Sequence, residues 1–413
     1  MFSKNKTIWI KSALLYFFVA ALLGALLRFA FVFELPEWIQ YKNIQHAHSH
    51  VAMMGWLTAA FYAFSCWFFK LDRPIYRTIF WASQATVLGM LISFPIQGYA
   101  FFSIFFSTAF MIVIYFFIYA VLKDLRQKPK EKDLLSTRFL KTALFFLGLS
   151  TLGLWTMGPI MASSLRGTAY YYGAVQFFLH FQFNGWFVFV LLGILFKVFE
   201  ANGIPFNRKM GDRFYLFLFI SCFLTFALAI AWSTPSLFLF LINSIGVLFQ
   251  TIALIYFLMI LKDVSKAAKK QFTNWHFFLW GIAFFCLTFK MFIQNMVAIP
   301  YLATISYTIH NFVIGFIHLL MLGALSTFLL GLMTYLKWEV NKWGVRIFLM
   351  GLVLTEVLLF GQGLLIWAGL GFIPNYHLVL ALASLLLPVG VGVILFRFKA
   401  TLQSREAEKS LGS

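Results

Sequence analysis

Twelve long apolar segments follow one another along this 413-residue chain, and they constrain its fold more than any other feature. Each is about 20 residues or longer, which is the length that a helix needs to cross a hydrocarbon core of about 30 Å. The composition agrees, because 62% of the residues are hydrophobic and only 11% are charged, far too apolar a balance for a soluble chain. The sequence therefore predicts an all-α polytopic membrane protein whose surroundings are the lipid bilayer. The expected spans are 8–33, 40–69, 75–97, 99–122, 138–162, 168–198, 214–232, 236–261, 273–298, 301–336, 345–370 and 376–398.

The basic residues predict the orientation of the chain. The net charge is +19, but most Lys and Arg lie in alternate loops, which is the positive-inside pattern and not a nucleic-acid-binding surface. Both termini are therefore expected on the cytoplasmic side of a bacterial inner membrane. Cys66, Cys222 and Cys286 form no C-x-x-C or C-x-x-C-H motif, so neither a disulfide framework nor covalently attached haem is expected. The basic loop residues include Lys123, Arg126, Lys128, Lys130, Lys132, Arg208, Lys209, Arg213, Lys266, Lys269 and Lys270.

Histidines recur at regular positions. His50, His180 and His310 are separated by 130 residues each and fall in the second, sixth and tenth expected helices. Each is followed by Gly five residues later, as are His276 and His318. This pattern predicts a single membrane domain over residues 1–413 with twelve transmembrane helices in three pseudo-repeated four-helix units. The expected units are about 1–135, 136–268 and 269–413.

Histidine side chains within a membrane usually have a specific role in binding or structure. An ionisable side chain at this depth costs a few kcal/mol, and it therefore normally faces the interior of a helix bundle. A neutral imidazole can bind a metal through one nitrogen while the other donates a hydrogen bond. Haem is favoured over a bare ion because its iron needs only one or two axial imidazoles, whereas zinc would need three or four close ligands. The alternative for each histidine is a hydrogen bond to a neighbouring helix.

The stretch HAHSH, residues 46–50, holds three of the eight histidines. His46 and His50 are one helical turn apart on one face, whereas His48 points roughly the other way. His50 is the deepest of the three and is the expected axial ligand. His46 or His48 would be a second ligand, a propionate partner or a copper ligand, or would have a solvated interfacial role. His310 and His318 are both candidates for the partner of His50.

Lys290 and Glu356 are the other ionisable residues expected to be buried, in the ninth and eleventh helices. They would pair with one another or form part of a proton route, and a purely structural ion pair is the alternative. Three amide side chains could extend a polar path: Gln294, Asn295 and Gln362.

Cations on the expected outer side could hold haem propionates. Arg28 and Arg166, with Lys42, are the available ones, and snorkelling to the interface is the alternative role. His276 and His377 are placed near helix starts at opposite faces and are not expected to bind a cofactor.

Twelve helices in three arcs of four, with histidines in helices two, six and ten, resemble subunit I of the haem–copper oxidases and nitric oxide reductases. The stretch HSHVAMMGW also resembles the HAHEMLFG-type motif of the NnrS family, a group of twelve-helix haem- and copper-containing proteins linked to nitric oxide tolerance, and IHLLMLGALSTFLLGLM is similar to that family's tenth helix. The resemblance implies a low-spin haem b held by His50 with His318 or His310. It places His180 where the oxidases have a copper-ligating histidine.

The sequence departs from the oxidase pattern at several positions. The segment 214–232 contains no histidine, helix ten lacks an H-x-H motif, and Asn184 stands four residues after His180 in place of Tyr or Glu. The loop near 370–376 lacks the paired arginines that hold propionates. The histidine set for the oxidase copper centre is therefore incomplete, and oxygen reduction as in a full terminal oxidase is not expected.

The leading hypothesis is a haem-binding integral membrane protein of respiratory electron transfer or of the nitric oxide response. Haem b is the expected cofactor, copper is a possible second one, and quinol or a redox partner protein would supply electrons. As an enzyme it would be an oxidoreductase of the haem–copper oxidase or nitric oxide reductase type. One alternative is a twelve-helix proton-coupled secondary transporter, although such proteins commonly divide into two similar halves. Another is a protein that assembles or partners a respiratory complex.

Overall fold

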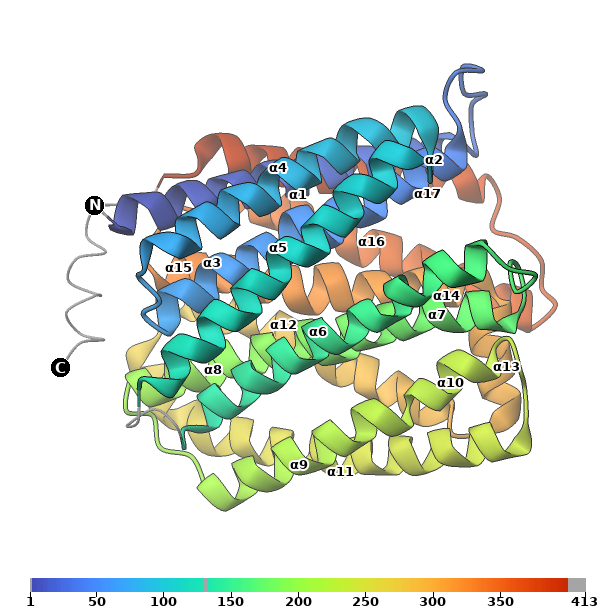
Figure 1. Cartoon of the computed structure of the whole chain (residues 1–413). Coiled ribbons are helices and arrows are strands. Elements are labelled where there is room, and N and C mark those ends of the chain that lie inside the picture. Colours follow the sequence, from blue (N-terminus) through green and yellow to red (C-terminus); the bar gives the residue numbers. More distant parts are fainter. Residues whose placement is uncertain (1, 129–132, 400–413) are drawn as a thin grey trace. The chain divides into compact units, whose positions relative to one another are not determined.

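The computed structural model describes residues 2–128 and 133–399. Twelve helical spans in this part of the chain are long and apolar enough to cross a membrane, and they follow one another from end to end (Figure 1). The prediction of an all-α multi-pass membrane protein is thereby confirmed. Lys130, Lys132 and both chain ends lie outside the described residues, so the cytoplasmic location of the termini stays a prediction.

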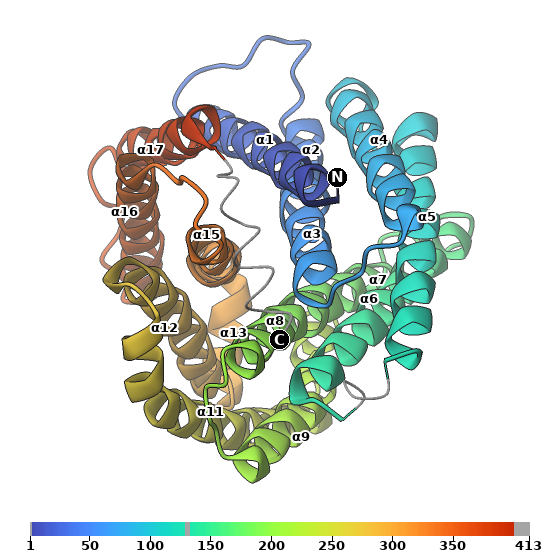
Figure 2. The ribbon, with the colours of Figure 1, turned by 90° about the vertical axis from the view of Figure 1, so that its left-hand side faces the viewer.

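The chain forms two compact units, of which the first comprises Met1–Asp124 and Leu329–Ser413. In this unit α1 packs against α2, η1, α3 and α17, and α17 also packs against α16 (Figure 2). Helices from the first and the last parts of the sequence therefore belong to the same unit, in which α1 contacts α17. Its elements are α1 (Phe2–Phe29), α2 (Tyr41–His50), the π-helix η1 (Val51–Thr58), α3 (Ala59–Phe68), α4 (Pro74–Gln97), α5 (Phe101–Arg126), α15 (Thr327–Tyr335), α16 (Lys342–Trp367) and α17 (Tyr376–Arg397).

The second unit comprises Leu125–Phe328. Here α6 packs against α7, η3 and α8, α9 packs along α11, and α12 packs against α11 and η4. Its elements are α6 (Leu135–Met161), α7 (Ala169–His180), the π-helix η3 (Phe181–Phe187), α8 (Val188–Ala201), α9 (Arg208–Leu224), α10 (Phe226–Ala231), α11 (Leu237–Gln271), α12 (Asn274–Met296), α13 (Pro300–Thr308), α14 (His310–His318) and the π-helix η4 (Leu319–Ser326). The expected division into three units stays a prediction.

Two expected helices are interrupted. The span predicted at 301–336 breaks at Ile309, whose extended backbone (φ −86°, ψ 103°) separates α13 from α14. The span predicted at 214–232 is divided at Thr225, which separates α9 from α10. Neither interruption contains Gly or Pro, so no helix-breaking residue type marks either position. The eighth helix, α11, continues to Gln271, ten residues past its predicted end at 261.

A π-helix follows directly after each of three histidines. His50 precedes η1, His180 precedes η3 and His318 precedes η4. A π-helical turn inside an α-helix is rare and is frequently found at functional sites. The spans that carry these three turns are also the most buried, with 94%, 83% and 67% of their central windows buried against at most 56% elsewhere. The same local structure therefore recurs at His50, His180 and His318, but not at His310.

The glycine five residues after each of these histidines lets a neighbouring helix approach the π-helix. A Cβ atom added at Gly55 would lie 2.8 Å from Tyr16 of α1, and one at Gly185 would lie 2.5 Å from the ring of Phe146 of α6. Gly323 is packed in the same way, against a side chain of α12. Distances this short leave no room for a side chain. Close packing thus accounts for the glycine at three of the five His-x4-Gly positions.

We predict that Gly185→Ala lowers the free energy of unfolding by about 1–3 kcal/mol, because the added methyl group overpacks the contact with Phe146. Gly281→Ala is the matched control, since no atom lies within 4 Å of its added Cβ, and it should cause no loss. Thermal or denaturant unfolding of the purified protein in detergent measures both. Equal losses from the two variants would contradict the packing argument.

Candidate functional site

His50 is presented with one free ring nitrogen. It is the last residue of α2 and is 9% exposed, and its Nδ1 lies 2.8 Å from the carbonyl oxygen of His46. Because a carbonyl only accepts, Nδ1 must carry the proton and donate, which leaves the lone pair on Nε2. No described residue forms a hydrogen bond with Nε2. This is the tautomer of a histidine that binds a metal through Nε2.

Two aromatic rings lie beside both His46 and His50. The ring centroid of His50 lies 4.3 Å from that of Phe94 and 6.0 Å from that of Tyr99. His46 faces the same two rings, at 6.1 and 4.5 Å. His48 instead turns toward α1, where its Nδ1 donates to the carbonyl oxygen of Ala20 at 2.8 Å. The helical spacing had predicted this division of faces.

A cation and a carboxylate lie close together in the first unit. Arg28, in the last turn of α1, is partly buried and lies within electrostatic reach of Tyr41, Tyr376 and Glu356. It forms no hydrogen bond or ion pair with any residue in the described part of the chain. Both carboxylate oxygens of Glu356 are buried and likewise have no hydrogen-bond partner there. Arg28 is thus an electrostatic neighbour of Glu356, whereas Arg166 lies exposed in the loop between α6 and α7.

His180 has surroundings unlike those of His50, because both of its ring nitrogens are engaged. Its Nε2 donates to the backbone carbonyl oxygen of Cys222 in α9 at 2.8 Å. Its Nδ1 must therefore be the unprotonated nitrogen, and it accepts a long hydrogen bond from the amide of Asn184 at 3.4 Å. The bonding of His180 is complete within the second unit.

Lys290 is held by amide oxygens and not by a carboxylate. This α12 residue is 3% exposed, and its Nζ donates to Oδ1 of Asn184 at 2.5 Å and to Oε1 of Gln294 at 2.7 Å. The ring of Phe316 lies 5.3 Å from Nζ, within cation–π range. Gln294 also accepts from Nε2 of Gln250 at 2.5 Å. Lys290 and Gln294 are thus hydrogen-bonded to one another, and no described carboxylate pairs with the ammonium group.

The remaining predicted residues have local roles. Asn295 accepts from the Thr251 hydroxyl at 2.6 Å. Gln362 bridges the loop after α16, donating to Gly371 O at 2.9 Å and accepting from Ile373 N at 2.8 Å. These hydrogen bonds stabilise the local structure around each side chain. The suggested pairing of Lys290 with Glu356 stays a prediction, because the two residues belong to different units.

The other histidines differ in exposure and role. His310 is exposed as the first residue of α14, whereas His318 is half-buried at its end. His276 caps α12, accepting from the backbone N–H of Thr273 at 3.1 Å, and His377 stacks on Phe31 at 5.3 Å. Among the described residues, no group of three or more His, Cys, Asp or Glu side chains is arranged to hold a metal ion.

Sequence reasoning missed several partners of the candidate residues. Phe94 and Tyr99 are two of many aromatic residues, and nothing in the sequence marks them as neighbours of His50. The carbonyl of Cys222 carries no sequence signal at all, because every residue has one. Gln250 did carry a signal, since it is a buried amide in a long apolar helix, and such residues normally have a specific partner.

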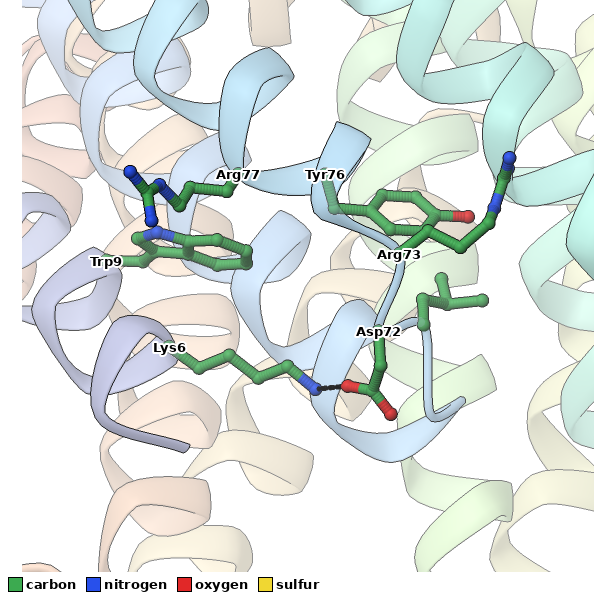
Figure 3. A pocket seen from close by; sticks show the side chains of 7 residues that line it. Lys6, Trp9, Asp72, Arg73, Tyr76 and Arg77 are labelled. Carbon is green, nitrogen blue, oxygen red and sulfur yellow. Dashed lines mark hydrogen bonds and ion pairs between the residues drawn. The ribbon is translucent and has the colours of Figure 1, made fainter. Parts of the chain in front are cut away.

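A shallow pocket in the first unit lies between the start of α1 and the start of α4 (Figure 3). Two ion pairs occupy its walls. Lys6 pairs with Asp72 at 2.5 Å, and Arg73 pairs with Asp124 at 2.7 Å, where the Tyr76 hydroxyl also donates at 2.7 Å. These contacts tie the ends of neighbouring helices, and they explain the pocket's charged residues structurally. The lining residues are Lys6, Trp9, Leu71, Asp72, Arg73, Tyr76 and Arg77.

Comparison with known proteins identifies the fold. No protein-family model and no curated protein sequence matches this chain. Among solved structures, a chain from the cryo-EM structure of a haem–copper terminal oxidase dimer is similar, with a TM-score of 0.64 and 14% sequence identity over 95% of this chain and 83% of that chain. The chain has the haem–copper terminal oxidase fold. The fold expected from the resemblance is thus confirmed, while the likeness to the NnrS family stays a prediction.

We predict that Asp124→Asn costs about 1–3 kcal/mol of stability, because the nearly buried carboxylate, with its side chain 11% exposed, accepts from both Arg73 and Tyr76. The matched variant is Asp72→Asn, whose side chain is 53% exposed, and it should cost at most about 1 kcal/mol. Unfolding in detergent measures the difference. A larger loss from the exposed position would contradict this account.

Proposed function

We propose that this protein binds haem b in the membrane through His50 and serves electron transfer. The observation that carries the proposal is the free Nε2 of His50, whose other nitrogen is fixed by the carbonyl of His46. A ligand histidine needs this combination, since the hydrogen bond sets both the tautomer and the orientation of the ring. The shared fold with a haem–copper terminal oxidase chain supports the same assignment.

The residues around His50 suit a porphyrin. Phe94 and Tyr99 provide flat apolar surfaces beside the imidazole, and aromatic side chains pack well against planar groups. Arg28 supplies a guanidinium group that makes no hydrogen bond with a described residue and that could pair with a propionate beside its electrostatic neighbour Glu356. Bound haem would supply a one-electron redox centre.

The local backbone and the burial at His310 and His318 are relevant to the choice of a second axial ligand. The sequence left His310 and His318 as alternatives. Of these, only His318 directly precedes a π-helix, as His50 does, and only His318 is partly buried. His318 therefore shares the local structure of His50, whereas its pairing with His50, which belongs to the other unit, stays a prediction. The electron donor in this proposal is quinol or a redox partner protein, and a role in the nitric oxide response would use the same haem.

An absorption spectrum of the purified protein tests the proposal. Expression with added haem should give a Soret band that shifts on reduction with dithionite. A colourless preparation would overturn the proposal and favour the proton-coupled transporter. Adding nitric oxide to the reduced protein would show whether an open or displaceable axial position exists.

We predict that His50→Ala weakens haem retention at least about tenfold, which is the lower range for losing an important metal-site interaction. His377→Ala should retain the wild-type haem content, because that histidine is exposed and stacks on Phe31. His276→Ala should also retain it, with some loss of stability from the missing cap. Pyridine-haemochrome quantification measures all three. Wild-type haem stoichiometry in His50→Ala would contradict the assignment.

A further inference from the structure

His180 raises the question of a second metal centre. The resemblance places this residue at a copper-ligating position, and the recurrent π-helix makes its local backbone similar to that of His50. The two side chains nevertheless differ in the property that decides ligation, which is whether a ring nitrogen has a free lone pair. The hydrogen-bond partners of both His180 ring nitrogens lie in the second unit.

We infer that His180 is not a metal ligand in this protein and that the Lys290 ammonium group is the resident cation of this site. The site is a buried hydrogen-bonded cluster, here called the lysine cluster, and it includes none of the residues proposed to hold haem. Its members are His180, Asn184, Gln250, Lys290 and Gln294.

The hydrogen bonds of His180 leave no nitrogen for a metal. Nε2 carries the proton, because it donates to the carbonyl of Cys222, and a protonated nitrogen cannot bind a metal ion. Nδ1 has the lone pair, but it faces the amide N–H group of Asn184. Freeing either nitrogen would break a buried hydrogen bond and leave its partner unsatisfied.

The surroundings also disfavour a second positive charge. The Asn184 side chain bonds to His180 with its nitrogen and to Lys290 with its oxygen, so a single amide separates the imidazole from the ammonium group. In a medium of low polarity, two cations this near to one another repel strongly. The Lys290 ammonium group also donates to the Gln294 oxygen and faces the Phe316 ring.

The ammonium group instead ties three elements together. Lys290 lies on α12, Asn184 lies in the π-helix η3, and Gln250, which reaches the cluster through Gln294, lies on α11. A buried lysine without a carboxylate is costly unless its protons are bonded. Two amide oxygens and an aromatic face meet that need. The ammonium group of the lysine thus links neighbouring helices, as a bound metal ion does in other proteins.

The test compares copper content and stability in full-length protein grown with added copper. Wild type, His180→Gln and Lys290→Met are purified in the same way, and copper per chain is measured by mass spectrometry. We expect the same copper content in wild type and His180→Gln. One copper per chain in wild type that disappears in His180→Gln would overturn the inference. If His180→Gln fails to fold, copper titration of wild type with detection of copper–imidazole ligation decides between the same two outcomes.

Thermal unfolding tests the role of the cation. Lys290→Met should lower the midpoint by several degrees, because the amide oxygens of Asn184 and Gln294 lose their shared donor. Lys266→Met is the matched control, since Lys266 is exposed on α11, and its midpoint should not change. An unchanged or raised midpoint in Lys290→Met would overturn the cross-linking role. The haem spectrum is a separate readout, so a colourless protein would refute the proposed function and leave this inference standing.

Discussion

The absence of water from the membrane interior is the constraint on which this structure depends. A polar group there must find its hydrogen-bond partner within the protein, or it pays a desolvation cost of several kcal/mol. His180 and Lys290 meet this requirement through the Cys222 carbonyl and two amide side chains, Asn184 and Gln294. His50 meets it with one nitrogen only. The other nitrogen, Nε2, forms no hydrogen bond with a described residue, and the proposed haem ligation rests on this difference from His180.

The π-helices show how backbone geometry serves these side chains. Each widens its helix directly after a histidine, and each contains a glycine against which the neighbouring helix packs. A widened turn changes the direction in which the following side chains point. In η3 this places Asn184 between His180 and Lys290. Similar local backbones can thus support a candidate ligand at His50 and a closed polar cluster at His180.

Much of the fold followed from the sequence, and the limits have physical reasons. Apolar length and loop charge predicted the twelve spans, because the bilayer imposes the same length on every crossing helix. The interruptions at Ile309 and Thr225 were not predicted, since no Gly or Pro marks either position. The opposite faces of His50 and His48 followed from helical periodicity alone. The separation of His318 from His310 did not, because both share the same glycine spacing.

The sequence by itself determined that this chain crosses a membrane with twelve helices and that a few imidazoles, together with Lys290 and Glu356, lie in those helices. These properties follow from composition and spacing, which the chain carries along its length. Only the tertiary structure decided that the Nε2 of His50 is free while both nitrogens of His180 are bonded. The reason is that the availability of a lone pair depends on the partners that other turns and other helices bring to it. Residue type alone does not specify those partners.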